Sequence, residues 1–209
     1  MSKEALFDIL SSISGLIPLI AFAYNFQNLD RIFKLIGLFF IIAALSDLLQ
    51  WLLPYWHFSN IWVVHIFVII NIIFFSVIYY MAFVNSLQKK ITLILSGLAL
   101  VLGLYSCKDI FDYPTVSNTA SSIVFIVLAL LFFFQLLTRQ EFVHIEKQGF
   151  FWFNASVLFY FSINIFLFML IAMIPLLERP SYYIINNITN IIANLLFTIA
   201  LLCRPQKAT

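Results

Sequence analysis

The residues most able to do chemistry are polar side chains set within long apolar segments. Asp47 lies inside one such segment, and Gln50 and Trp51 follow it at i+3 and i+4 on the same helical face. His65 lies near the start of the next segment. A carboxylate within a membrane span costs about 2.5 to 3.5 kcal/mol, so it faces the interior, is paired or is protonated. Asp47 is therefore either the charge of a ligand, ion or proton site or one end of a structural hydrogen bond between helices.

A stripe of amides marks the last apolar segment. Asn186, Asn190 and Asn194 recur at i, i+4 and i+8, and Tyr183 lies about one turn ahead of them. An amide in hydrocarbon without a partner costs several kcal/mol as an order of magnitude. This face must therefore turn toward other polar helices or toward water, which leaves two interpretations: packing contacts between helices, or the lining of a cavity.

The elements that position these residues are set by composition. The chain has 209 residues, of which 64% are hydrophobic and 10% are charged, and its mean hydropathy is +1.06. A soluble domain of this size cannot bury that much apolar surface, so the lipid bilayer is the expected solvent. Most of the 25 phenylalanines are expected to face lipid. The net charge of +2 and the absence of a long basic run exclude nucleic acid as a partner.

The expected fold class is all-α: a polytopic integral membrane protein whose single domain, residues 1–209, is a bundle of seven transmembrane helices. Each span is a long apolar segment bounded by polar or proline-containing turns. The predicted spans are residues 6–24, 32–53, 61–84, 91–105, 120–137, 150–177 and 182–203.

Basic residues in the short loops predict the orientation. With the C-terminal tail in the cytoplasm, 8 of the 11 Lys and Arg residues lie on the inner side. The inner residues are Arg31, Lys34, Lys89, Lys90, Arg139, Lys147, Arg204 and Lys207, and the outer ones are Lys3, Lys108 and Arg179. We therefore expect the N-terminus outside, the C-terminus in the cytoplasm, and a multi-pass protein of the plasma (inner) membrane.

This orientation brings the polar residues to two levels. A ligand-binding pocket is expected in the outer half, with Asp8, Ser11 and Ser14 of the first span at the same depth. The predicted ligand-binding residues are Asp47, Gln50, Trp51, His65, Tyr183, Asn186, Asn190 and Asn194. A second set, Ser156, Tyr160 and Asn164 in span 150–177, is expected in the inner half, where packing is its predicted role.

No cofactor, metal ligand or catalytic residue is assigned from the sequence. His57 and His65 occur without an HxxxH or HExxH pattern, and nothing resembles a nucleophile elbow. The layout resembles that of rhodopsin-like proteins in helix number only, since the last span has no lysine to bind retinal. Cys107 and Cys203 fall at opposite ends of the predicted bundle, so no disulfide is expected between them.

Three functions fit these patterns. The first is a non-enzymatic ligand-binding, sensory or accessory membrane protein, whose partners would be the lipid bilayer, a small-molecule ligand, and a cytoplasmic protein or a second copy. The second is a small-solute transporter. Asn71 in span 61–84 and Asn190 in the last span resemble the midplane asparagines of SWEET-type sugar carriers, which implies a 3+1+3 helix arrangement, although no Pro-Gln motif lies within a span. The third is an intramembrane metal-dependent hydrolase, with Asp47 as a third ligand beside the histidines.

Overall fold

The computed structural model describes residues 3–138, 144–171, 173–175 and 178–203, and this part of the chain is helical without strands. Three basic residues counted for the orientation, Arg139, Arg204 and Lys207, lie outside these ranges, as do residues 172, 176 and 177 of the predicted span 150–177. The elements are α1 (Lys3–Ser14), α2 (Leu16–Asn25), η1 (Phe26–Asn28), α3 (Arg31–Leu52), η2 (Leu53–Trp56), α4 (Ile61–Ala82), α5 (Ser86–Ser106), η3 (Cys107–Asp109), α6 (Thr115–Leu137), η4 (Ile145–Lys147), α7 (Gly149–Leu170) and α8 (Arg179–Leu202).

Seven of the described helical stretches are long and apolar enough to cross a membrane. They are α1 through η1, α3 with η2, α4, α5 with η3, α6, α7 and α8. A span of about 20 apolar residues matches the thickness of the bilayer core. The structure is therefore compatible with a multi-pass membrane protein built as a seven-helix bundle.

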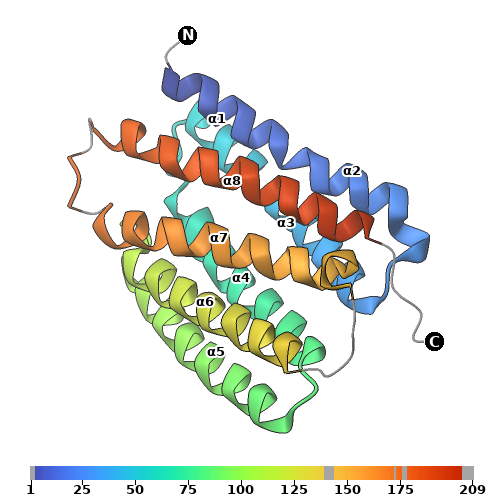
Figure 1. Cartoon of the computed structure of the whole chain (residues 1–209). Coiled ribbons are helices and arrows are strands. Elements are labelled where there is room, and N and C mark those ends of the chain that lie inside the picture. Colours follow the sequence, from blue (N-terminus) through green and yellow to red (C-terminus); the bar gives the residue numbers. More distant parts are fainter. Residues whose placement is uncertain (1–2, 139–143, 172, 176–177, 204–209) are drawn as a thin grey trace.

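The helices form a ring that follows the order of the chain. Each helix from α2 to α8 packs against its neighbours in sequence, and α8 closes the ring by packing against α1 and α2 (Figure 1). Successive spans alternate in direction, so the two chain ends lie at opposite ends of the bundle (Figure 1). We name these the Trp51 end, which holds the start of α1, η2, η3 and the start of α8, and the Lys89 end, which holds the α4–α5 turn and the end of α8.

Local capping explains where several helices begin. Asp30 precedes α3 and accepts a hydrogen bond from the Phe33 amide at 2.9 Å. Asn85 does the same for α5 through the Leu87 amide at 2.9 Å. Such side chains satisfy amides that lack a partner in the first helical turn. As a result α5 begins at Ser86, one turn before the predicted residue 91.

The first span is interrupted at Gly15, between α1 and α2. Pro18 lacks the amide hydrogen that would bond to the Ser14 carbonyl, and proline commonly breaks or kinks a helix in this way. The Asn194 side chain of α8 lies at this break and donates to the Ser14 hydroxyl at 2.9 Å. The interruption therefore occurs where another helix supplies a polar partner.

Nine of the 25 phenylalanines are buried and form much of the interior, so the expectation that most of them face lipid stays a prediction for the others. Phe75 stacks on Phe125 with 4.6 Å between ring centroids and also contacts Phe39 and Phe153. The buried rings are Phe39, Phe40, Phe75, Phe83, Phe125, Phe132, Phe153, Phe168 and Phe197. Composition cannot distinguish this core from a lipid-facing surface, because both are apolar.

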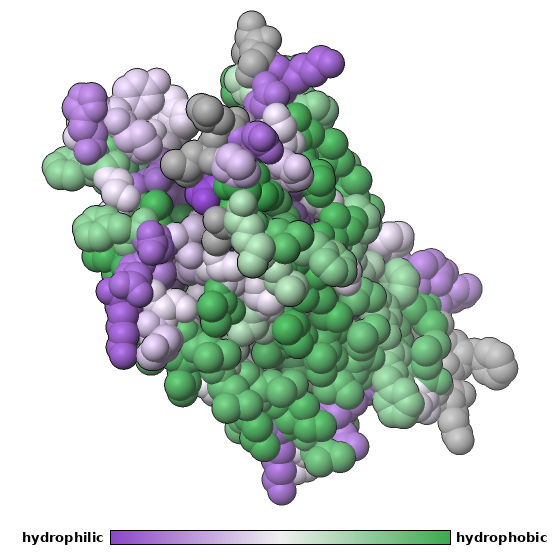
Figure 2. Space-filling view, turned by 90° about the vertical axis from the view of Figure 1, so that its left-hand side faces the viewer, coloured by the Kyte–Doolittle hydropathy of each residue, from purple (hydrophilic) through white to green (hydrophobic). Residues whose placement is uncertain are grey.

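The outer surface of the ring is also apolar. Ile20, Leu98, Val101, Phe134 and Phe166 are each more than half exposed. Figure 2 shows a broad green surface, with hydrophilic side chains gathered mainly toward its edges. Soluble monomers rarely expose apolar area of this extent, so the surface is compatible with a lipid environment.

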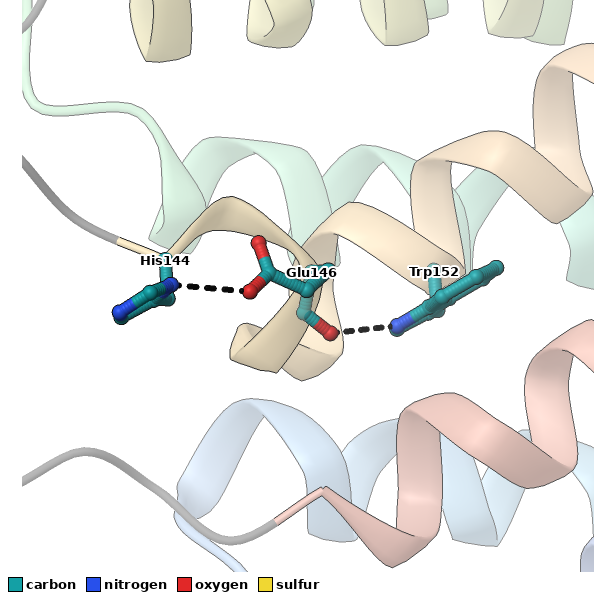
Figure 3. A network of polar contacts seen from close by, with 3 residues as sticks. All are labelled: His144, Glu146 and Trp152. Atoms are coloured by element: carbon teal, nitrogen blue, oxygen red, sulfur yellow. Dashed lines mark hydrogen bonds and ion pairs between the residues drawn. The ribbon is translucent and has the colours of Figure 1, made fainter.

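A short turn precedes α7 at the Lys89 end (Figure 3). The Trp152 indole donates to the Glu146 carbonyl at 2.8 Å, and the Glu146 carboxylate lies 3.0 Å from His144 Nδ1. The backbone amide of Glu146 and the nearby His144 ring lower the pKa of this exposed carboxyl. Here the chain forms the 3-10 turn η4 and then begins α7 at Gly149.

Gly149 gives a test of the packing at the Lys89 end. A Cβ at this position would lie 2.5 Å from the Ala200 carbonyl oxygen and 2.7 Å from Phe33 Cζ. We predict that Gly149→Ala destabilises the protein by about 1 to 3 kcal/mol through overpacking, measured by thermal unfolding in detergent. The matched control is Gly97→Ala, since a Cβ there meets nothing within 4 Å. Equal melting temperatures for the two variants would contradict the close approach of α7 and α8.

Candidate functional site

Polar contacts between α8 and α1 form a regular series. The Asn187 amide donates to the Asp8 carboxylate, the Asn190 amide to the Ser11 hydroxyl at 2.9 Å, and the Asn194 amide to the Ser14 hydroxyl at 2.9 Å. The two helices run in the same direction, and the partners recur once per turn on both. We call this series the α8 amide ladder. It satisfies amides that would be costly to leave unpaired between apolar helices.

The adjacent face of α8 is bonded to α7. The Tyr160 hydroxyl donates to the Asn186 side chain at 2.9 Å, and the Asn164 amide donates to the Thr189 hydroxyl at 2.7 Å. The Ser156 hydroxyl donates to the Ala193 carbonyl at 2.8 Å. Neighbouring residues of α8 thus serve different helices, because side chains one position apart point about 100° apart.

The predicted asparagine stripe is divided between these two faces. Asn190 and Asn194 belong to the amide ladder, whereas Asn186 accepts its hydrogen bond from α7. For Asn190 and Asn194 the contacts match the packing interpretation of the stripe. Asn186 is half-buried.

Asp47 lies on the face of α3 that is buried at Phe40, but Asp47 itself is not covered. It lies two turns after Phe40 on the same face of α3, and the Phe40 ring packs edge-on against Phe197 of α8 with 5.1 Å between centroids. Its side chain is nevertheless exposed. Within the described residues it has neither a hydrogen bond nor an ion pair, and it lies close enough to Tyr160 to interact electrostatically.

Two further tyrosines, one from a loop and one from α8, lie within electrostatic range of one another beside Tyr160. Tyr113, in the connection between η3 and α6, interacts with both Tyr160 and Tyr183. Burial is the main reason why the pKa of the Tyr113 phenol is raised well above its usual range, and the two other tyrosines add to the shift. Tyr113 is therefore a neutral hydroxyl that can donate a hydrogen bond. We call Asp47, Tyr113, Tyr160, Tyr183 and Asn186 the Asp47 cluster.

His65 and Asn164 are buried polar residues in this half of the bundle that keep unpartnered atoms. His65 is 3% exposed, and its Nε2 atom lies 2.9 Å from the Asp112 carbonyl, next to Tyr113. Its Nδ1 atom has no hydrogen-bond partner, and neither has Oδ1 of the fully buried Asn164. Buried polar atoms are normally paired with protein groups or water, so these two atoms keep unused hydrogen-bonding capacity.

Gln50 and Trp51 lie at the end of α3, one turn beyond Asp47. Together with Pro54 and Tyr55 they line a hollow that is open to the outside. The Gln50 amide donates to Ser46 at 3.3 Å, and the Trp51 ring lies 5.1 Å from the Tyr55 ring. The hollow therefore continues the face that carries Asp47.

The structure brings together part of the predicted set. Asp47, Tyr183 and Asn186 share the Asp47 cluster, Gln50 and Trp51 line the adjacent hollow, and His65 bonds to the loop that carries Tyr113. Asn190 and Asn194 belong to the α1–α8 contact.

Tyr160, Tyr113 and Asn187 are the residues that sequence reasoning missed. The inner-half placement of Tyr160 and Asn164 is wrong: α7 ends at Leu170 rather than 177, and both residues bond to the first half of α8. Asn187 could have been found from the matched spacing of Asp8, Ser11 and Ser14. Tyr113 follows no periodic pattern that would have identified it.

The chemistry of the cluster is that of binding. Its members are one carboxylate, neutral phenols and an amide, which can hold a ligand by charge and hydrogen bonds. No group of three or more His, Cys, Asp or Glu that could hold a metal ion occurs among the described residues. A nucleophile hydrogen-bonded to a base, the usual arrangement for covalent catalysis, is not among the contacts of this cluster in the described part of the chain.

No protein-family model, curated protein sequence or solved structure matches the chain.

The amide ladder can be tested with a double-mutant cycle. Replacing Asn190 and Ser11 by alanine, singly and together, should give a coupling free energy of about 0.6 to 1.7 kcal/mol, the range found for hydrogen bonds between membrane helices. The measurement is reversible unfolding in detergent micelles. Ser12→Ala is the matched control, because Ser12 is exposed and bonds only to the Asp8 carbonyl of its own helix. Additive effects of Asn190→Ala and Ser11→Ala would remove the ladder as a source of stability.

Proposed function

We propose that the protein is a multi-pass integral membrane protein with its N-terminus outside and its C-terminus in the cytoplasm, in the plasma (inner) membrane. The apolar outer surface and the seven long apolar helices support insertion. The excess of basic residues in the loops of the Lys89 end supports this orientation. The exposed Trp51, Tyr55, Trp56 and Phe58 at the Trp51 end are typical of a membrane–water interface.

In this membrane the protein is a non-enzymatic ligand-binding protein with a sensory or accessory role. The observation that carries the proposal is the uncovered carboxylate of Asp47, which faces inward and lies beside Tyr160 in an otherwise apolar bundle. A charge at such a position is typical of ligand, ion or proton sites. Its ligand would enter from the Trp51 end, where the open hollow lies.

A small-solute carrier is the second candidate. Its support is the position of the Asp47 cluster between helices from both halves of the chain, as in transporters that bind their substrate between two repeats. In the described structure each helix packs against its neighbours in sequence, and α8 lies between α1 and α7. A 3+1+3 repeat would have to fit this order of helices. An intramembrane hydrolase is less well supported, because within the described residues the hydrogen bond of His65 goes to the Asp112 carbonyl and not to Asp47.

The partners proposed are the lipid bilayer, a small molecule at the Asp47 cluster, and either a cytoplasmic protein or a second copy at the Lys89 end. The η4 turn supplies exposed charges at that end, including Glu146 and His144 (Figure 3).

The orientation is tested with the native cysteines, which are both free and lie at opposite ends. In intact cells a membrane-impermeant maleimide should label Cys107 in the Cys203→Ser variant. It should label Cys203 in the Cys107→Ser variant only after permeabilisation. Partial burial raises the pKa of the Cys203 thiol, so less of it is thiolate at a given pH and its labelling is slower. Labelling is therefore normalised to denatured protein. The reverse pattern would overturn the proposed orientation.

Ligand binding is tested by thermal stability in detergent across a panel of metabolites and lipids between about pH 5 and 8. A ligand at about 100 times its Kd should stabilise the wild type by about 2.7 kcal/mol, a shift of several degrees in Tm. Asp47→Asn should abolish the shift, whereas Asp109→Asn, an exposed carboxylate in η3, should retain it. Flux into liposomes then separates a receptor from a carrier. A panel without any response, with Asp47→Asn as stable as the wild type, would contradict a ligand site.

A further inference from the structure

We infer, on the basis of the ligand-binding role proposed above, that the Asp47 cluster binds an ammonium group, with Asp47 as its counter-ion and neighbouring aromatic rings as its walls. The ammonium could belong to a soluble amine or to the headgroup of a lipid. The shared chemistry is a cationic nitrogen on a largely apolar molecule.

The first support is the unbalanced charge of Asp47. Among the described residues the one ion pair joins His144 and Glu146, at the other end of the bundle. Two of the three basic residues near the Trp51 end have other partners: the Lys108 ammonium lies over the Tyr105 ring at 4.4 Å, and Arg179 Nε donates to the Ile174 carbonyl at 3.0 Å. The third, Lys3, lies in the first turn of α1. A carboxylate within a membrane span is stabilised by an opposite charge, and a cationic ligand would supply it.

The second support is the kind of side chain around the carboxylate. Trp51 lies one turn beyond Asp47 on the same face and is 62% exposed, and its ring neighbours Tyr55 in the open hollow. Tyr160 lies on the opposite side of the ring of helices and interacts with Asp47 electrostatically. Tryptophan and tyrosine rings attract cations held within about 6 Å of their faces. A carboxylate one helical turn from an exposed tryptophan, and within electrostatic range of a tyrosine, is a combination suited to ammonium groups.

The third support is the exclusion of other charged guests. An anion would face the Asp47 carboxylate with no basic side chain within ion-pair distance of it in the described structure. A divalent cation requires several oxygen ligands, commonly from more than one carboxylate, and the described residues offer no such group. A single carboxylate with aromatic walls instead matches one diffuse positive charge.

The test uses the full-length protein in nanodiscs of phosphatidylglycerol, a lipid without an ammonium group. Choline is compared with its neutral isostere 3,3-dimethylbutan-1-ol by isothermal titration and thermal unfolding. We expect choline to bind at least about tenfold more tightly than the isostere. Asp47→Glu, which keeps the charge, should retain binding. Asp47→Asn should weaken it by about tenfold or more, and Asp109→Asn should leave it unchanged.

A second arm distinguishes the source of the ammonium group. If a lipid headgroup is the occupant, adding phosphatidylcholine to the nanodiscs should raise the Tm of the wild type but not of Asp47→Asn, and should compete with choline. If a soluble amine is the occupant, phosphatidylcholine should have neither effect while choline still binds.

Three results would overturn the inference: equal binding of the isostere, unchanged choline binding by Asp47→Asn, or no response to choline and phosphatidylcholine. Its failure is distinguishable from failure of the ligand-binding role. A neutral metabolite that stabilises the wild type would keep that role and exclude the ammonium group. No response to any ligand would remove both.

Discussion

The constraint on which the rest of the structure depends is the need to pair every buried polar group of α8. Asn187, Asn190 and Asn194 are bonded to α1, while Asn186 and Thr189 are bonded to α7. An apolar helix can rotate against its neighbours at little cost, but a helix with polar groups on two faces cannot. These bonds therefore fix the rotation of α8 and, through it, the positions of the first and sixth spans, which close the ring.

The two halves of the bundle are stabilised in different ways. Toward the Lys89 end the interior is filled by phenylalanine rings around Phe75, together with Tyr79, whose hydroxyl donates to Asn154 at 2.9 Å. Toward the Trp51 end the interior holds phenols, amides and His65. A closely packed aromatic core has no space for a polar ligand, whereas polar groups with unpartnered atoms can form hydrogen bonds with one. The distribution of packing thus separates a structural half from a half suited to binding.

Asp47 links the architecture to the proposed function. It is placed inward by the same face of α3 that packs Phe40 against Phe197, yet it lies beyond the region that these rings fill. The α8 bonds hold Tyr160 and Asn186 together nearby. A positively charged ligand would balance the charge of the Asp47 carboxylate. The hydrogen bonds of α8 and this carboxylate therefore have different roles: the hydrogen bonds position the cluster, and the carboxylate is available to bind the ligand.

The sequence by itself determined the helical class, the seven apolar helices and the polar level shared by α1, α3 and α8, because composition and the spacing of polar residues act within one helix. It did not determine which amides pair with each other, the position of Tyr160 near Asp47 and Tyr113, or which of the phenylalanines are buried. These features depend on how each helix is rotated and where it ends. For example, α7 ends at Leu170, and Tyr160 and Asn164 form hydrogen bonds with the first half of α8. Contacts between helices far apart in sequence leave no local periodic signal, so only the tertiary structure decided them.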